Sequence, residues 1–391
     1  MRVIRPRAAF AAALFVSMLA CGEGGAPSAD ASGLATVFDS TRADTVVART
    51  AGQVPADRVR GLTEELRIQP DAEDTSAFTQ VYQFVVGRDG RIYVYDDGSS
   101  RIFIYGPDGT LQRAFGRAGA GPGEFGQNNG MAMLPDGRLA FLDYQNARLS
   151  FFTAAGDTAG AWRVTSGFFT NNGLRTDTTG ALLLARPVTA PRDGEILGRM
   201  GLVRLGADGA LVDSLAPADL PVTRVSYIAE MQGGRSQYNA PHSAQLHWAW
   251  HPHGWYAVAS GDRYVVELAT PGRARRIERD APAVPVPEAE RTDAQERITA
   301  NLRRNDPNWT FRGPPIPSTK APVMGLRATG DGRLWVRVAT PTEEIPEAER
   351  DPATAGRPNP LRFRDANEWE VFDADGRFRG RVRLPARASL M

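Results

Sequence analysis

The strongest constraint on the fold is an internal repeat with an offset of 47 residues. The segment Asp89–Ile92 recurs as Asp136–Leu139, and the segments around Arg101 and Arg148 match in the same register. Each copy reads as four short strands, with Asp-Gly at the first turn, where glycine adopts the positive φ that hairpins require. Four antiparallel strands in about 45 residues is the size of one propeller blade. The repeat therefore predicts an all-β chain folded as a β-propeller with antiparallel four-stranded blades.

The number of blades follows from the spacing of the turn glycines. These glycines stand 47, 43, 74 and 78 residues apart, at Gly90, Gly137, Gly180, Gly254 and Gly332. The two long spacings exceed one blade by about thirty residues each, too few for another blade, so we expect insertions in loops. Residues 34–69 contain three strand-like segments, ATVF, DTVVA and EELRI, which we expect to supply a sixth sheet, because an unpaired sheet edge favours aggregation. We predict six blades, with five blades or an incomplete sixth as alternatives.

One insertion, residues 282–322, contains the helical candidate of the chain. The other segments are interrupted too often by the 40 Gly and 28 Pro residues to form long helices. Pro287 can begin a helix, and Asp293 and Arg297 have the spacing of an i, i+4 ion pair. The apolar stripe of this helix consists of Ala294, Ile298 and Leu302. A stripe this narrow docks on the protein's own fold or on a partner, and we expect the former.

The N-terminus has the features of a targeting segment. Residues 1–20 hold three arginines followed by the apolar stretch Ala8–Met18, which suits a signal peptide and is too short to cross a bilayer. The tripeptide Leu19-Ala20-Cys21 resembles the lipobox of bacterial lipoproteins, in which the Cys is lipidated. Glycine rather than aspartate directly after this Cys, at Gly22, resembles the pattern that sorts lipoproteins to the outer membrane. We therefore expect a signal peptide (1–20), a lipidated Cys21 with a flexible tether (21–33) and one propeller domain (34–391), the alternative being an ordinary secretory signal.

Charge and motif content exclude several classes of function. The formal net charge is +1, and removing the signal peptide with its three arginines makes it −2, so no basic field exists to attract nucleic acid. A single cysteine excludes an internal disulfide framework and a thiolate metal cluster. The sequence contains neither a G-x-S-x-G elbow nor an H-E-x-x-H helix motif. We predict no catalytic residue, no nucleic-acid partner and no cofactor.

The two clean repeats and the loop Gly116–Phe125 resemble the NHL-type six-bladed β-propeller family of bacterial lipoproteins. In that family G-x-x-G-x-G-P-G-E-F joins one blade to the next, and D-x-x-N-x-R-I follows the second strand. Matching positions of the second motif are Asp143, Asn146, Arg148 and Leu149 in one repeat, and Asp96, Arg101 and Ile102 in the other, where Ser99 replaces Asn. The resemblance extends over residues 60–385. It implies a propeller fold and an envelope compartment but no single activity.

The repeated polar residues have structural roles in our interpretation. The glycine-rich loop 116–123 is not followed by a helix or by Gly-Lys-Ser/Thr, so we expect a turn between blades rather than a phosphate cradle, with Glu124 accepting backbone N–H groups. Catalytic residues form a unique constellation, whereas a pair repeated in each blade is better explained as a brace. We therefore expect charge-assisted hydrogen bonds that brace the loops from Asp96, Arg101, Asp143, Asn146 and Arg148.

All four histidines fall between positions 242 and 253. In a strand His247 and His251 share one face, while Leu246, Trp248 and Trp250 share the other. His247 and His251 are therefore candidate metal ligands, since two histidines and a carboxylate suit zinc or iron. Pro252 ends the strand and the segment holds no acidic residue, which favours polar side chains facing a channel or loop beside buried tryptophans.

Two classes of function remain open. The first is a lipid-anchored, non-catalytic binding or assembly module of the cell envelope, attached to the outer membrane, whose propeller face binds a protein, peptide or glycan. The alternative is a metal-dependent propeller enzyme similar to lactone hydrolases or lyases, which would require His247 or His251 beside carboxylates from other blades. A purely structural envelope spacer is a third possibility.

Overall fold

The computed structural model describes most of the chain. The described residues are 2–3, 33–41, 44–69, 78–164, 173–191, 198–206, 208–231, 234–270, 272–350, 361–386 and 388–390. Cys21, the predicted signal peptide other than residues 2–3, and the predicted tether other than Gly33 lie outside this part of the chain.

The described residues form five propeller blades, each built from four antiparallel strands in chain order. Blade 1 contains β6 (Val81–Val86), β7 (Ile92–Asp96), β8 (Arg101–Tyr105) and β9 (Leu111–Phe115). Blade 2 contains β10 (Asn128–Met133), β11 (Leu139–Asp143), β12 (Arg148–Phe152) and β13 (Thr158–Arg163). Blade 3 contains β14 (Leu174–Thr176), β15 (Leu182–Pro187), β16 (Met200–Leu205) and β17 (Leu211–Leu215).

Blades 4 and 5 carry additional strands on their outer edges. Blade 4 contains β20 (His247–His251), β21 (Trp255–Ala259), β22 (Val265–Leu268) and β23 (Ala274–Arg279). Blade 5 contains β26 (Val323–Ala328), β27 (Leu334–Val338), β30 (Glu368–Phe372) and β31 (Phe378–Arg383). The first strands of neighbouring blades contact one another, β6 with β10, β10 with β14, and β20 with β26, so these strands are innermost. The prediction of an all-β propeller is confirmed, with the five-blade alternative matching the described residues.

Phe125 fixes the contact between blades 1 and 2. It is 1% exposed, and its ring lies 4.5 Å from that of Phe141 in β11, measured between centroids. The glycine-rich loop between β9 and β10 delivers this side chain. At Gly116, where φ is +94°, a Cβ atom would lie 2.1 Å from the Phe125 ring, so the loop tolerates only glycine there. The loop is thus a turn between blades, as expected, and it inserts one aromatic ring between two sheets.

The expected sixth sheet from residues 34–69 is wrong for the described residues. Two of its strand-like segments become β2 (Thr36–Asp39) and β3 (Thr45–Thr50), and β3 pairs in parallel with the outer strand β23 of blade 4. Arg49 forms an ion pair with Glu278 across this edge at 2.9 Å. The edge of blade 4 is free and has complementary charge, so these strands extend an existing sheet instead of forming a new one.

The rest of the N-terminal segment runs from blade 5 to blade 1. After the 3-10 turn Ala56–Arg58, the short strand β4 (Arg60–Gly61) pairs with β31 of blade 5. Strand β5 (Leu66–Arg67) then pairs with β1 (Arg2–Val3). Leu62 packs on the outer apolar face of blade 5, which contains Trp335 and Trp369, and the C-terminal residues Ala388 and Leu390 cover the same face.

Blade 1 also has an apolar face that no other blade covers in the described residues. The face consists of Ile92, Val94, Phe103 and Tyr105, and it is covered by Leu66, Ile68 and Phe78. Irregular chain from both ends of the protein thus packs on the two blade faces between which a sixth blade would stand. We call this region, residues 60–68 with 384–386 and 388–390, the seam.

A buried ion pair joins blades 4 and 5. Arg279 at the end of β23 forms a bidentate pair with Glu370 in β30, with N–O distances of 2.8 and 2.9 Å, and both side chains are almost fully buried. Arg279 also donates to the backbone carbonyls of Thr50 and Gly52, and Arg381 donates to Glu370. Burial opposes ionisation of Glu370, but its bonds and the charges of the two arginines lower its pKa. The added N-terminal strand is held to both blades at this point.

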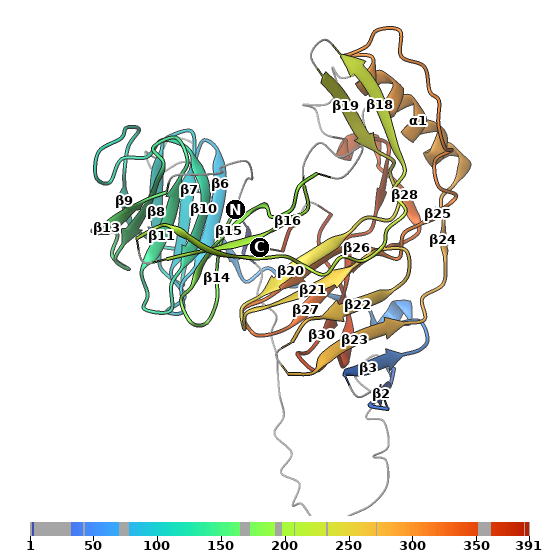
Figure 1. Cartoon of the computed structure of the whole chain (residues 1–391), viewed down its shortest axis with the longest axis horizontal. Helices are drawn as coiled ribbons and strands as arrows, with labels where there is room; N and C mark the ends of the chain where they lie inside the picture. The colour runs from blue at the N-terminus through green and yellow to red at the C-terminus, as the bar shows by residue number, and fades with distance from the viewer. Residues whose placement is uncertain are drawn as a thin grey trace, which may run out of the picture.

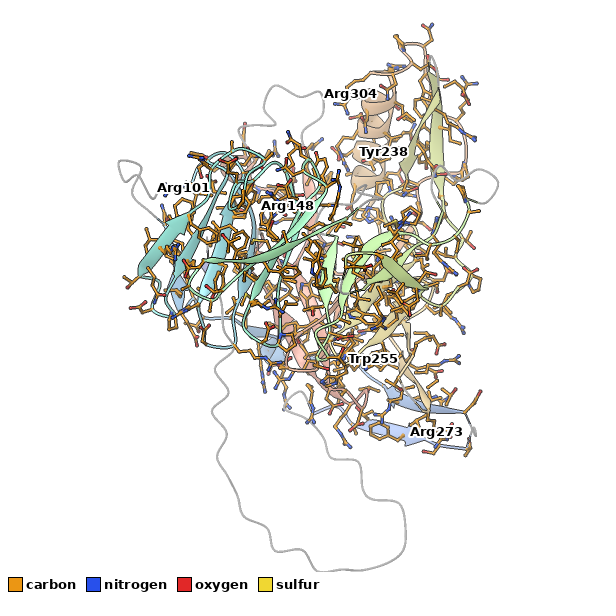
Figure 2. The ribbon with its side chains drawn as sticks, turned by 60° about the vertical axis from the view of Figure 1, so that its left-hand side comes forward. Arg101, Arg148, Tyr238, Trp255, Arg273 and Arg304 are labelled. Atoms are coloured by element: carbon orange, nitrogen blue, oxygen red, sulfur yellow. The ribbon has the colours of Figure 1, made fainter. Side chains whose placement is uncertain are left out.

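The two long insertions pack against each other rather than on separate blades. The first forms the hairpin β18 (Ser226–Met231) and β19 (Gly234–Asn239), and the second forms α1 (Glu288–Leu302), the single α-helix of the described chain. The predicted stripe Ala294, Ile298 and Leu302 is buried against the hairpin, and the predicted Asp293–Arg297 ion pair forms at 2.8 Å. Figure 1 shows α1, β18 and β19 standing together beyond the blades, and Figure 2 places Tyr238 and Arg304 in this appendage.

Four further short strands and a 3-10 turn lie in the loops around the appendage and blade 5. The strands β24 (Val284–Pro285) and β25 (Thr319–Lys320) pair with each other at the base of α1. The strands β28 (Thr342–Glu344) and β29 (Phe363–Asp365) form a hairpin within blade 5's loop, with a 3-10 turn at Glu347–Glu349. None of the helices in the described chain is both long and apolar enough to span a membrane.

We predict that Phe125→Ala destabilises the protein by about 3–5 kcal/mol, because it leaves a cavity between two blades. Thermal and urea unfolding measure this loss. Tyr144→Ala, which removes a ring that is 39% exposed, is the matched control and should cost less than about 1 kcal/mol. Equal losses in the two variants would contradict the role assigned to Phe125.

Candidate functional site

The strongest candidate for a binding site is a cavity of about 600 Å³ beside the innermost strands of blades 4 and 5. We call it the channel cavity, because the innermost strands of a propeller surround its central channel. Its lining residues are Leu246, His247, Trp248, Met324, Gly325, Leu326, Arg327, Arg337, Asn367, Trp369, Ala386, Ala388, Ser389 and Leu390. None of these residues is acidic.

Two arginines give the channel cavity its charge. Arg337 in β27 lies opposite Gly325 in β26 and Trp369 in β30, so it projects from the face of blade 5 that borders the seam. Because Gly325 has no side chain, nothing in β26 covers the Arg337 stem. Arg327 lies two residues further along β26 and is exposed. Both guanidinium groups therefore belong to one wall of the cavity.

Backbone carbonyls, not carboxylates, are the hydrogen-bond acceptors for these cations. Arg327 Nη1 donates to the carbonyl of Leu326 at 3.1 Å, and its Nε lies 3.5 Å from the carbonyl of Leu390. Arg337 Nε is buried and has no hydrogen-bond partner among the described residues. Charged donors left without an anion in a partly desolvated site cost free energy, and such sites are suited to anionic ligands.

Arg175 in β14 of blade 3 is not among the residues that line the channel cavity. Its side chain donates to the carbonyl of Leu174 at 2.9 Å. Burial, and to a lesser degree the positive charge of Arg327, lowers its pKa.

Aromatic and polar groups complete the wall. Trp369 Nε1 donates to Asn367 Oδ1 at 2.8 Å, and Asn367 Nδ2 donates to the carbonyls of Pro385 and Ala388, which fixes the C-terminal segment against the cavity. Trp248 is half-buried and packs edge-on against Tyr256 at 5.4 Å. The lining therefore combines the two arginines with the half-buried Trp248, while Trp369 is only 7% exposed.

His247, a predicted candidate metal ligand, lines the channel cavity and is half-buried. Burial lowers its pKa, and a hydrogen bond to the backbone of Val323 partly opposes this effect. The imidazole is therefore mainly neutral at pH 7. Leu246, Trp248 and Trp250 pack with the apolar residues of blade 3, and Leu246 and Trp248 also contribute to the lining of the channel cavity.

His251, the second candidate, has a different environment. It is 0% exposed, its ring stacks on Trp255 at 3.9 Å, and Nε2 lies 3.2 Å from the carbonyl of Gly332 in blade 5. The backbone N–H of His253 lies 3.2 Å from Nδ1. Both ring nitrogens are thus engaged within the protein. Among the described residues, no group of three or more His, Cys, Asp or Glu side chains is arranged to hold a metal ion.

The repeated polar residues bind the loops between blades individually. Asp143 accepts hydrogen bonds from the backbone N–H groups of Gly126, Gln127 and Asn146, and from the Asn146 side chain. Arg148 donates to the carbonyls of Ala120 and Glu124 in the glycine-rich loop. Asp143 and Arg148 therefore brace the same connection without forming an ion pair with each other.

The equivalent residues of blade 1 follow the same pattern in part. Asp96 is 0% exposed and accepts backbone hydrogen bonds from Thr79, Gln80 and Ser99. The Arg101 guanidinium lies 5.6 Å from the centre of the Phe103 ring and is not paired with Asp96. Figure 2 shows Arg101 and Arg148 together on the blade 1 and blade 2 side of the molecule.

Glu124 has the role expected for it in this loop. It accepts a hydrogen bond from the backbone N–H of Gly121 at 2.8 Å and from Arg117 Nε at 2.8 Å. These bonds, that from Gly121 first, hold the pKa of Glu124 below its usual value. The loop's N–H groups are thus satisfied by the protein itself.

A second charged cluster, which the sequence analysis missed, surrounds Lys320. Its side chain is 0% exposed, and Nζ donates to Asp365, to Thr342 Oγ1 at 2.9 Å and to the carbonyl of Thr340 at 3.1 Å. Glu290 of α1 lies 3.7 Å from the same Nζ and accepts from Thr342 Oγ1 at 2.5 Å. The cluster fastens the base of α1 to blade 5.

His242 completes the Lys320 cluster. Its Nε2 lies 3.3 Å from Glu290, and its backbone has the unusual φ of +64°. A sequence signal for this cluster existed, because Lys320 is the only lysine among 46 basic residues. The cluster lies beside a larger cavity of about 750 Å³ between blades 4 and 5, which is lined in part by Lys320, Thr340 and Thr342.

Comparison with known proteins supports the fold. The family DUF5128, described as a 6-bladed beta-propeller, matches residues 72–155. No curated protein matches this sequence. Among solved structures, the chain is similar to a member of the DUF4221 family from Bacteroides vulgatus, with 10% identity, coverage of 79% of this chain and 82% of that chain, and a TM-score of 0.45.

Two enzymes are also among the similar solved structures. One is virginiamycin B lyase from Staphylococcus aureus, with 11% identity, coverage of 81% of this chain and 73% of that chain, and a TM-score of 0.34. The other is a gluconolactonase from Xanthomonas campestris, with 16% identity, coverage of 79% and 78%, and a TM-score of 0.33. The strand order of the described residues is that of an all-β propeller, and the family matched by residues 72–155 is described as six-bladed.

We predict that acid destabilises the protein partly through His251. Burial lowers the pKa of this histidine in the folded state, so the unfolded chain binds a proton more readily. Stability therefore rises with pH through the range near 6.5 and is lost as the pH falls below it. Unfolding measured from pH 7.5 to pH 5 should show a weaker pH dependence in His251→Gln, whereas the control Arg304→Gln, at an exposed position of the appendage, should keep the wild-type slope. An unchanged slope in His251→Gln would contradict this account.

We also predict that Lys320→Met destabilises the protein by about 3–5 kcal/mol at pH 7.5, because it leaves Asp365 and Glu290 buried without their counter-ion. Arg304→Met removes an exposed cation from the same appendage and should change stability by less than about 0.5 kcal/mol. Urea unfolding at pH 7.5 measures both variants. A Lys320→Met loss no larger than that of Arg304→Met would contradict the assigned pairing.

Proposed function

We propose that this protein is a bacterial lipoprotein of the cell envelope, held at the outer membrane by a lipid on Cys21. The support is the order of features in residues 1–33: a basic start, an eleven-residue apolar stretch, the tripeptide Leu19-Ala20-Cys21 and a polar tether. A twelve-residue flexible tether has an r.m.s. span of roughly 20 Å, enough to let the propeller stand clear of the lipid surface.

We propose further that the propeller is a non-catalytic binding module for a protein, peptide or glycan. The observation that carries this role is the channel cavity. Its described lining supplies cations, tryptophan surface and backbone carbonyls, which are groups that bind, and contains no carboxylate for general acid or base catalysis. The appendage of α1, β18 and β19 adds surface beyond the blades, as insertions that carry binding functions commonly do.

A metal-dependent hydrolase or lyase would need a different arrangement. Such an enzyme requires imidazole and carboxylate ligands that converge on one point. Among the described residues, both ring nitrogens of His251 lie within hydrogen-bonding distance of backbone groups, those of Gly332 and His253. His247 lines a cavity that also contains two arginines. Elemental analysis of the purified protein, with melting curves in the presence and absence of a chelator, tests this alternative directly.

We predict that wild-type protein expressed in a Gram-negative host incorporates radioactive palmitate and fractionates with outer membranes, whereas Cys21→Ser does neither. Capture of tagged wild-type protein from detergent-solubilised envelope should then recover a reproducible partner. Phe125→Ala, in which the contact between blades 1 and 2 is weakened, is the control. A partner that is captured equally by this variant binds independently of the fold.

The two readouts fail independently. Absence of palmitate in the wild type would overturn the anchor. A failure to capture any reproducible partner, combined with turnover of a substrate by the pure protein, would overturn the non-catalytic binding role.

A further inference from the structure

The channel cavity has a positively charged wall. Arg327 and Arg337 both line it. Other described arginines pair with a carboxylate, as Arg279 does with Glu370, or donate to backbone carbonyls, as Arg148 does. The Arg337 side chain forms neither an ion pair nor a hydrogen bond with any described residue, and its Nε is buried.

We propose that the channel cavity binds the anionic end of an organic ligand, a carboxylate or a phosphate ester, between Arg327 and Arg337. This proposal rests on the proposed binding role and names the class of ligand for it. A guanidinium group presents a fork of N–H donors that matches an oxyanion, and hydrogen bonds to a charged partner are stronger than neutral ones.

The size and lining of the cavity indicate an organic anion rather than a simple inorganic ion. A volume of about 600 Å³ accommodates a body the size of one or two sugar rings in addition to the charged group. Trp248 is half-buried and supplies aromatic surface in this lining, and the exposed Ser389 supplies a polar contact. The ligand body therefore has a polar periphery and at least one apolar face.

His247 gives the site a neutral hydrogen-bonding group near the cations. Burial lowers its pKa, with the bond to the Val323 backbone partly opposing this, so at pH 7 the positive charge of the cavity comes from the arginines. Because arginine stays protonated over the accessible pH range, we expect ligand binding to persist from pH 6 to pH 8 and to weaken as salt screens the charges.

The test uses three probes with the same sugar frame: D-glucose, D-glucuronate and D-glucose 6-phosphate. Isothermal titration of the folded wild-type protein at low salt should show binding of at least one anionic probe and none of neutral glucose. Arg337→Gln and Arg327→Gln should each weaken that binding by about tenfold or more, since each removes a charged hydrogen-bonding group. The control Arg333→Gln removes an arginine of the same blade that is 39% exposed and paired with Asp331, and should bind as the wild type does.

The outcomes are distinct. Binding of glucuronate or of glucose 6-phosphate that is lost in Arg337→Gln supports the proposal and identifies which oxyanion the site accepts. Failure of both anions to bind, equal binding of glucose, or binding unchanged in Arg337→Gln would each overturn it. Circular dichroism of each variant separates loss of binding from loss of fold. Capture of a partner from the envelope would survive a negative titration, so failure of this inference differs from failure of the proposed function.

Discussion

Each blade of this propeller is a sheet with two apolar faces, and each face has to be covered by protein. Between neighbouring blades the cover is the next sheet, with Phe125 as the aromatic wedge between blades 1 and 2. Blades 1 and 5 each have one face without such a neighbour in the described residues. Burial of those faces by Ile68 and Leu66 on one side and Leu62 and Leu390 on the other therefore decides how both ends of the chain run.

The seam has a consequence for the binding site. A full four-stranded blade would pack against the face of blade 5 that carries Arg337, and would bury the arginine or force a paired carboxylate beside it. The C-terminal segment covers this face with backbone carbonyls and small side chains, such as Ala388 and Ser389, and leaves a cavity next to the guanidinium groups. The C-terminal segment that covers blade 5 thus also determines which groups surround the arginines of the channel cavity.

The fold was predictable where local pattern decides it. Asp-Gly turns and alternating apolar strands identified the blades, Pro287 and the stripe Ala294, Ile298 and Leu302 identified α1, and strand periodicity separated His247 from Trp248. Long-range pairing was not predictable in the same way. The sequence of strand β3 is compatible with pairing to many sheet edges. Its actual partner is β23, whose edge is free and whose Glu278 lies opposite Arg49.

The candidate site was harder to predict for a similar reason. The clustering of the four histidines suggested a metal site. His251 instead forms a hydrogen bond within the fold, and its position in the sequence does not indicate this bond. Two sequence features pointed to unusual environments. Arg337 is the one charged residue in the apolar strand LWVRV, and Lys320 is the single lysine of the sequence. The roles of Arg337 and Lys320 could not be predicted without knowing which groups the fold places around each side chain.

The most direct test of the central claim is a crystal structure of the protein grown with the anionic probe that binds in solution. The account predicts ligand density in the channel cavity, with the oxyanion in contact with Arg337 and Arg327 and the sugar ring beside Trp248. Ligand density elsewhere, or an Arg337 guanidinium already paired with a carboxylate of the protein itself, would contradict the account.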